Sequence, residues 1–88
     1  MIRINAIKPA ADQVVLTVAG QLTWETAAVL GREGRRWLEK QEGLVLELAD
    51  VDFIDTAGIN LLKGLVRQGV SLQGASPFIA LLLARHRL

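Results

Sequence analysis

The sequence predicts an α/β fold in which a mixed four-stranded sheet is covered by three main helices. Segments with strand and helix patterns follow one another in the order strand, strand, helix, strand, helix, strand, helix. Leu44–Leu48 is almost entirely apolar, which is typical of a strand buried on both faces of a parallel sheet, and this strand is expected to continue to Ile54. Two strand–helix–strand units in series require crossovers, so the later strands are expected to run parallel.

The first two strands are expected to pair as a hairpin. Apolar and polar residues alternate over Ile2–Ala6, and Pro9 is expected to stop this strand because proline has no N–H to donate. Gln13–Ala19 is rich in β-branched residues and predicts a second strand, which Gly20 ends. The hairpin turn is therefore placed around Pro9–Asp12.

The first helix is expected to begin with Thr23 as its N-cap. A threonine hydroxyl can cap a helix, and Glu25 in the first turn suits the positive end of the helix dipole. Gly43 is the expected stop. One side of the helix is apolar at helical spacing, and its members are Ala27, Leu30, Gly34, Trp37 and Leu38.

The second and third helices have clear start signals. Asp55–Gly58 is expected to open the second helix directly after the buried strand, and Gly69 is expected to end it. Val70–Gly74 predicts a short strand. Ser76–Pro77 combines a capping hydroxyl with a proline at the first helical position, so the last helix is expected to begin there and to continue to Leu88.

Length and composition predict a single domain over residues 1–88 and exclude several kinds of function. Ten Lys and Arg residues against nine Asp and Glu residues give a net charge of +1, too weak a field to gather nucleic acid or anionic lipid. The chain has no cysteine, which argues for a reducing cytoplasm. The longest apolar run, Phe78–Ala84, is far shorter than the about 20 residues that span a bilayer. No apolar signal core follows Met1, so a cytoplasmic protein without direct membrane insertion is expected.

The segment Asp55–Gly58 is the place where function is expected. The hydroxyl of Thr56 lies at the mouth of a helix, where unpaired N–H groups and the helix dipole favour an anion. A phosphate on Thr56 would gain these donors and add about −1.5 to −2 of charge beside Asp55. Ala57 has a small side chain that projects little from the surface, and Gly58 is expected to let another chain's backbone approach closely. The alternative is that Thr56 only caps the helix and Asp55 only supports the turn.

Four segments of the chain, in the right order, resemble STAS domains. Phe53–Ile59 is similar to the family signature, in which Asp, then Ser or Thr, then a small residue and Gly open the second helix. Val18–Thr23 resembles the strand that enters the first helix, and Leu44–Val51 resembles the central strand. Gly69–Leu72 followed by Ser76–Pro77 resembles the last strand and the start of the final helix.

The resemblance implies a non-enzymatic regulatory module that binds proteins and needs no cofactor. In anti-sigma-factor antagonists of this family, the hydroxyl residue after the signature Asp is phosphorylated by a partner serine kinase, and that position is Thr56 here. By the same resemblance, Asp55 would orient the hydroxyl or the kinase. The expected partner-binding residues are Asp55, Ala57, Gly58, Ile59, Thr23, Trp24 and Lys63.

A second reading of the same resemblance stays open. Anti-sigma-factor antagonists usually carry an acid where this chain has Thr23. Gln21–Thr26 is more similar to the small STAS subunits of Mla-type phospholipid-transport ABC systems, which dock on the ATPase of the transporter. The helix that follows Thr56 is also about one turn shorter than is usual in the family. The partner is therefore expected to be either an anti-sigma-type serine kinase or an ABC-transporter ATPase.

Catalysis and metal binding are not expected. The only histidine, His86, has no acid nearby in sequence, and Asp50, Asp52 and Asp55 have no histidine or lysine near them with which to form an acid–base site. Trp24 and Trp37 are expected in the core or at its edge, and Trp24 is also a candidate partner contact. A further apolar stripe exceeds what one helix face needs and leaves room for a homodimer or a docking surface. Its residues are Phe78, Ile79, Leu81, Leu82 and Leu83.

Overall fold

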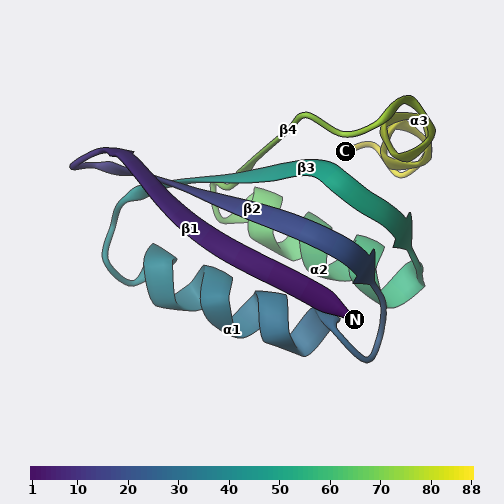
Figure 1. Cartoon of the computed structure of the whole chain (residues 1–88), viewed down its shortest axis with the longest axis horizontal. Coiled ribbons are helices and arrows are strands. Elements are labelled where there is room, and N and C mark those ends of the chain that lie inside the picture. Colours follow the sequence, from purple (N-terminus) through teal and green to yellow (C-terminus); the bar gives the residue numbers. More distant parts are fainter.

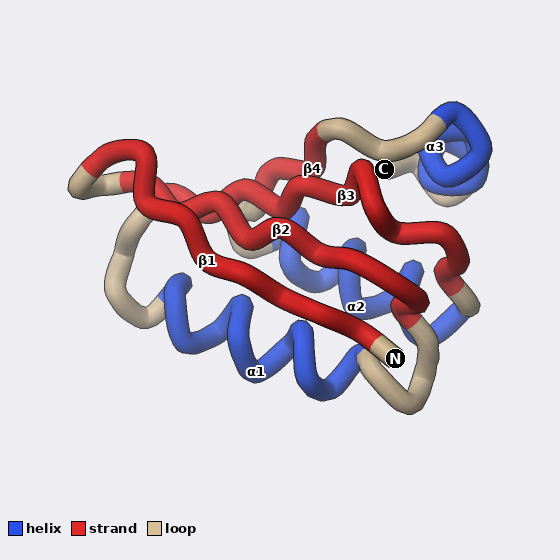
Figure 2. The backbone as a smooth tube through the Cα atoms, viewed as in Figure 1, coloured by secondary structure: helices blue, strands red, loops and turns tan.

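The chain folds into one four-stranded sheet with helices packed against it, as Figures 1 and 2 show. The computed structural model describes all 88 residues. The sheet has the order β1-β2-β3-β4, so each strand pairs with the next one along the chain. The elements are β1 (Ile2–Ala10), β2 (Gln13–Leu22), α1 (Ala27–Leu38), β3 (Gly43–Ile54), α2 (Thr56–Arg67), β4 (Ser71–Gln73) and α3 (Pro77–Arg85).

The strand directions confirm the predicted mixed sheet. β1 and β2 form an antiparallel hairpin, whereas β2 pairs with β3, and β3 with β4, in parallel. The prediction that Pro9 stops the first strand is wrong, because β1 continues to Ala10. β1 is an edge strand, and its register with β2 shifts between Ile7 and Ala10. Proline is tolerated at such a place because no ladder hydrogen bond from its nitrogen is needed.

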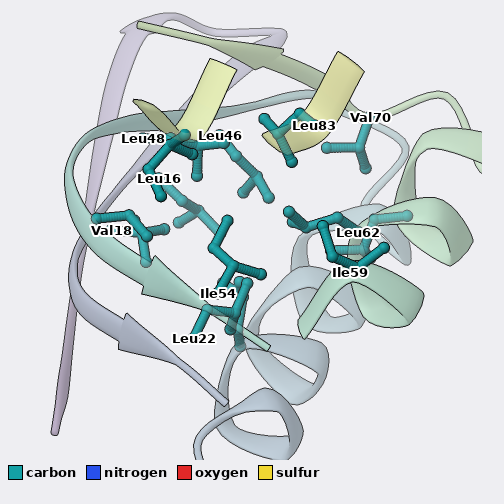
Figure 3. Close-up of a cluster of buried hydrophobic side chains, with 14 of the residues drawn as sticks. Leu16, Val18, Leu22, Leu46, Leu48, Ile54, Ile59, Leu62, Val70 and Leu83 are labelled. Carbon is teal, nitrogen blue, oxygen red and sulfur yellow. The ribbon is translucent and has the colours of Figure 1, made fainter. Parts of the chain in front are cut away.

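The core lies on one face of the sheet. Alternate residues of β2 and β3 point to this face, where α1 and α2 lie (Figure 1), and α3 closes the core beside β3 on the β4 side. Figure 3 shows side chains of β2, β3 and α2 meeting Leu83 of α3 in this layer. The buried apolar residues are Val14, Leu16, Val18, Leu22, Leu30, Leu44, Leu46, Leu48, Val51, Ile54, Ile59, Leu62, Leu65, Val70, Ile79 and Leu83.

The central strand is buried on one face only. Leu44, Leu46 and Leu48 are buried, while Val45 and Glu47 between them are half-buried on the opposite face. The prediction of burial on both faces is therefore wrong. A short apolar run does not distinguish the two cases, because valine also occurs on a half-open sheet face.

The first helix begins later than predicted. Its N-cap is Thr26 and not Thr23, because Thr23–Thr26 forms a turn of its own. The Thr26 hydroxyl accepts from the Thr23 N–H (2.9 Å) and donates to the Gln21 carbonyl (2.7 Å). The stop is also different: Gln41 adopts a left-handed conformation (φ 57°), and Gly43 is already the first residue of β3.

β2 continues to Leu22, so the prediction that Gly20 ends this strand is wrong. The elements after β3 follow the predicted order with shorter ends. α2 ends at Arg67, and Gly69 (φ 96°) turns the chain as expected. β4 covers only Ser71–Gln73. Ser76 caps α3 by accepting from the Ile79 N–H (3.4 Å), and the helix ends at Arg85 instead of continuing to the C-terminus.

Candidate partner-binding site at the start of α2

The site is built where β3 passes directly into α2. Asp55, in extended conformation, is the N-cap of α2, and one carboxylate oxygen accepts from the Gly58 N–H (2.9 Å). The other oxygen accepts from the Trp24 N–H (2.9 Å), in the loop between β2 and α1. The main-chain N–H of Asp55 donates to the carbonyl of Leu22 (3.1 Å), at the end of β2. Asp55 therefore ties the start of α2 to the end of β2 and to the loop that carries Trp24.

These hydrogen bonds favour the ionised form of the Asp55 carboxylate. Donation from the Gly58 N–H, and next from the Trp24 N–H, lowers the pKa of Asp55 below its ordinary value of 3.8. Desolvation acts in the opposite direction and is outweighed. A fixed negative charge therefore sits beside Thr56 at neutral pH.

Thr56 is the first residue of α2, and its side chain is exposed. The cap of this helix is Asp55, so the alternative in which the Thr56 hydroxyl acts as the cap is wrong. Among the chain's threonines and serines, only Thr56 and Ser71 are exposed; Thr17, Thr23, Thr26 and Ser76 are half-buried. The Thr56 hydroxyl is thus accessible and is not needed to complete the helix.

Two of the predicted contact residues point inward. Ile59 is 2 % exposed and belongs to the core, so the prediction that it contacts a partner is wrong. Gly58 is also buried, and a Cβ there would collide with the Leu22 carbonyl and lie 2.8 Å from Cγ2 of Ile54. The close approach that glycine permits is therefore to the chain's own β2 and not to a second protein.

The other predicted contact residues reach the surface near Thr56 or on its side of α2. Thr23 and Ala57 are half-buried. Trp24 is 73 % exposed, so its expected place in the core is wrong and its role as a contact candidate is open. Lys63 follows Thr56 by seven residues, which places it on the same side of α2, about 10 Å along the axis.

Phe53 is a further exposed aromatic residue at this end of the sheet and was not predicted as a contact residue. It is 48 % exposed and pairs in register with Gln21 at the end of the sheet, just before Asp55. The signal was present in the sequence: if Ile54 points into the core, the alternation of a strand turns Phe53 outward. Two exposed aromatic residues therefore lie close to Asp55 along the chain or through its hydrogen bonds: Phe53 precedes it by two residues, and the Trp24 N–H donates to its carboxylate.

Acidic groups at this end do not form a metal centre. No group of three His, Cys, Asp or Glu side chains comes close enough to hold a metal ion. None of the three helices is long and apolar enough to cross a membrane. The arrangement offers an accessible hydroxyl, a fixed carboxylate and exposed aromatic rings, which suit recognition by another macromolecule.

Comparisons with known proteins identify relatives of the chain by family and by fold. A family model described as "Mlab, STAS domain" matches residues 6–88. The chain is similar to the structure of an anti-sigma factor antagonist from Mycobacterium paratuberculosis, with a TM-score of 0.77 and 18 % identity over 99 % of this chain and 81 % of that one. No curated protein sequence matches the chain.

Two structures of SpoIIAA, one unphosphorylated and one phosphorylated, are similar to the chain as well. The unphosphorylated anti-sigma factor antagonist SpoIIAA gives a TM-score of 0.72 at 14 % identity, covering 93 % of this chain and 82 % of that chain. The phosphorylated form of the Bacillus cell fate determinant SpoIIAA gives 0.74 at 14 % identity, covering 96 % and 83 %. At such identities the likeness concerns the fold.

Proposed function

The chain belongs to the STAS domain family, and we propose that it is a regulatory protein-binding domain switched by phosphorylation of Thr56. The observation that carries the proposal is the exposed Thr56 hydroxyl at the first position of α2, directly after a helix cap supplied by Asp55. Phosphorylation there removes no hydrogen bond that the helix needs. The domain is proposed to act in the cytoplasm, without catalysis or a cofactor of its own.

The phosphate would change both charge and shape at one spot. It would add about −1.5 to −2 of charge next to the ionised Asp55, at the positive end of α2. Repulsion between the phosphate and the Asp55 carboxylate weakens the hydrogen bond that this carboxylate accepts from the Trp24 N–H. The added phosphate also blocks part of the surface that a partner contacts. A partner seated over Thr56, Ala57 and Trp24 is therefore released.

The proposed partner is a serine kinase of the anti-sigma class. The likeness to anti-sigma factor antagonists supports this choice, and for one of these proteins a phosphorylated form exists. In this role the unphosphorylated domain binds the kinase, so that the kinase no longer holds its sigma factor.

The test is phosphorylation by candidate kinases from the same genome, mapped by mass spectrometry. Phosphate is expected on Thr56 and not on Ser71, the other exposed hydroxyl residue, which lies on β4. Thr56→Ala should abolish labelling, and Ser71→Ala should leave it unchanged. Labelling that persists in Thr56→Ala contradicts the assignment.

A second candidate function is supported by the description of the matching family. In this alternative the domain is an accessory subunit of a Mla-type phospholipid-transport ABC complex and docks on its ATPase through the same surface. Co-purification with an ATPase whose gene is adjacent to that of this protein favours the transport function. An adjacent gene for a kinase or a sigma factor favours the signalling function. Thr56→Glu is expected to weaken docking in either case, and Thr56→Ala to preserve it. If both variants bind as the wild type does, Thr56 has no switching role.

A further inference from the structure

Charge is divided unevenly along the chain. Residues 1–55 carry nine acidic and six basic side chains, whereas residues 56–88 carry four basic side chains and no acid. The overall net charge of +1 thus conceals a C-terminal third with a charge of +4. The basic residues of this third are Lys63, Arg67, Arg85 and Arg87, joined by His86.

These cations have no partners in the folded chain. The structure contains two ion pairs, Lys8–Glu42 (2.7 Å) and Arg36–Glu33 (3.6 Å), and both lie within residues 1–55. No carboxylate therefore comes within 4.0 Å of any basic group of the C-terminal third. The side chains of Arg67, Arg85 and Arg87 are exposed to solvent and that of Lys63 is half-buried, so this positive charge can attract an external anion.

The cations cluster where the two C-terminal helices end. A hollow between the second half of α2 and the chain after α3 is lined by the cationic side chains of Lys63, Arg67 and Arg87 together with Val66, His86 and Leu88. Arg87 is held in a left-handed conformation (φ 63°), which closes the end of α3 through the bond from the Leu88 N–H to the Leu83 carbonyl (3.0 Å). The basic cluster is thus part of the folded structure.

The same helix, α3, presents exposed apolar side chains in its first half. Phe78 is 65 % and Leu81 is 62 % exposed, although Ile79 and Leu83 already supply the buried face of the helix. A shallow depression is lined by Phe78, Leu81, Leu82 and Arg85. Leu81 precedes Arg85, and Leu82 precedes His86, by four residues, so the apolar half and the basic half of α3 share one side.

We propose that this side of α3, with the basic ends of α2 and α3, binds the surface of an anionic lipid membrane. Phe78 and Leu81 enter the boundary between headgroups and acyl chains, and the basic side chains contact lipid phosphates. The binding is peripheral, since α3 is much too short to span a bilayer. The net charge that argued against anionic lipid is an average over two unlike parts of the chain.

A membrane surface fits these residues better than two other ligands, a second copy of the chain and a small free anion. In a dimer formed through this surface, the unpaired cations of one copy would face those of the other. The repulsion between them opposes such a dimer. A small free anion would contact only the cations and would leave Phe78 and Leu81 in water. A lipid surface satisfies the charged and the apolar groups together. The inference does not depend on the switch proposed at Thr56.

The test is co-sedimentation of the full chain with vesicles. Binding is expected to vesicles of equal parts phosphatidylcholine and phosphatidylglycerol, and not to phosphatidylcholine alone. It is expected to be lost in about 1 M NaCl, where charges are screened over about 3 Å. Arg85→Gln with Arg87→Gln should weaken binding about 25-fold, since each cation near such a surface contributes about fivefold. Leu81→Ser should weaken it about tenfold.

The matched control is Arg32→Gln with Arg35→Gln, which removes two exposed cations from α1 and should change binding less than about twofold. Circular dichroism should show all variants folded, and Thr56→Glu should bind vesicles as the wild type does. Three results would overturn the proposal: no binding to phosphatidylglycerol vesicles at low salt, an equal loss in the α1 control, or release by inorganic phosphate at matched ionic strength. Binding of poly-glutamate without vesicle binding would instead identify an acidic polypeptide as the ligand.

Discussion

At the scale of single residues, Asp55 connects three parts of the chain through its carboxylate and its main chain. It caps α2 through Gly58, holds the loop before α1 through Trp24, and bonds to the end of β2 at Leu22. Asp55→Ala is expected to lower the thermal unfolding midpoint by about 4–8 °C, the effect of losing a helix cap in a domain of this size. Asp52→Ala, which removes an exposed acid three residues earlier, should leave the midpoint almost unchanged. Equal midpoint shifts in the two variants would contradict the role of Asp55.

The lowered pKa of Asp55 predicts an acid-dependent part of the stability. Because the folded-state pKa lies below the unfolded value of 3.8, the stabilisation is fully present above that value and is lost as pH falls through the folded-state pKa. The wild type and Asp55→Asn should therefore differ in unfolding free energy by a constant amount above about pH 5, and the difference should shrink at lower pH. Urea denaturation over a pH series measures this. A difference that does not change with pH would show that the carboxylate charge is not involved.

Gly58 and Gly64 lie in the same helix and should respond oppositely to alanine. At Gly58 a Cβ meets the Leu22 main chain, which cannot move aside, so Gly58→Ala is expected to destabilise the protein by about 1–3 kcal/mol. At Gly64 nothing lies within 4 Å of the added Cβ, and Gly64→Ala should stabilise by up to about 1 kcal/mol through helix propensity. Urea unfolding of both variants measures the two signs. The same sign for both would show that the close crossing of β2 and α2 is not what requires Gly58.

At the scale of elements, α3 is held to the core mainly by Ile79 and Leu83, its two buried residues. Leu83→Ala is expected to cost about 2–5 kcal/mol of unfolding free energy, because it leaves a cavity in the core near Val70 (Figure 3). Leu81→Ala removes the same atoms from an exposed position and should cost much less. Hydrogen exchange in the Leu83→Ala variant should rise first in α3. Equal unfolding costs for the two variants would mean that α3 does not contribute to the core.

The starts of α2 and α3 could be predicted because a single residue caps each of them. Asp55 and Ser76 follow strand or turn residues directly and accept from the N–H three positions on. The start of α1 could not be predicted in the same way, because two threonines compete for it. The Thr26 hydroxyl is occupied by Thr23 and Gln21, so a local turn replaces the helical turn that the spacing indicates. The prediction that Pro9 ends the first strand also failed. Whether a proline ends a strand depends on whether that strand lies at the edge of the sheet, which the local sequence does not show.

Within the candidate site, sequence reasoning found the segment but not the direction of every side chain. Thr56 and Asp55 could be placed because a helix start fixes the roles of its first residues. Gly58 and Ile59 could not, because which face of α2 meets the sheet depends on how β2 and α2 cross. Trp24 is exposed for a reason that only the fold supplies: the Asp55 carboxylate fixes its N–H in a loop outside the layer of helices and strands.

At the scale of the whole molecule, all three helices share one core, so the chain is expected to unfold in a single cooperative transition. Its two tryptophans should report this transition unequally. Trp37 packs against the core, donates to Glu33 (3.1 Å) and lies 4.5 Å from the Lys40 ammonium, whereas Trp24 is already exposed. Trp24→Phe should therefore keep most of the fluorescence change on urea unfolding, and Trp37→Phe should lose it.

In both variants the far-ultraviolet circular dichroism should change at the same urea concentration as the fluorescence that remains. Separate transitions would mean that α3 or the hairpin unfolds independently, whereas a signal lost in Trp24→Phe would place that ring inside the folded structure. The emission of Trp24 in the Trp37→Phe background would then serve as a direct reporter of a partner at the Thr56 surface, because little else changes its surroundings.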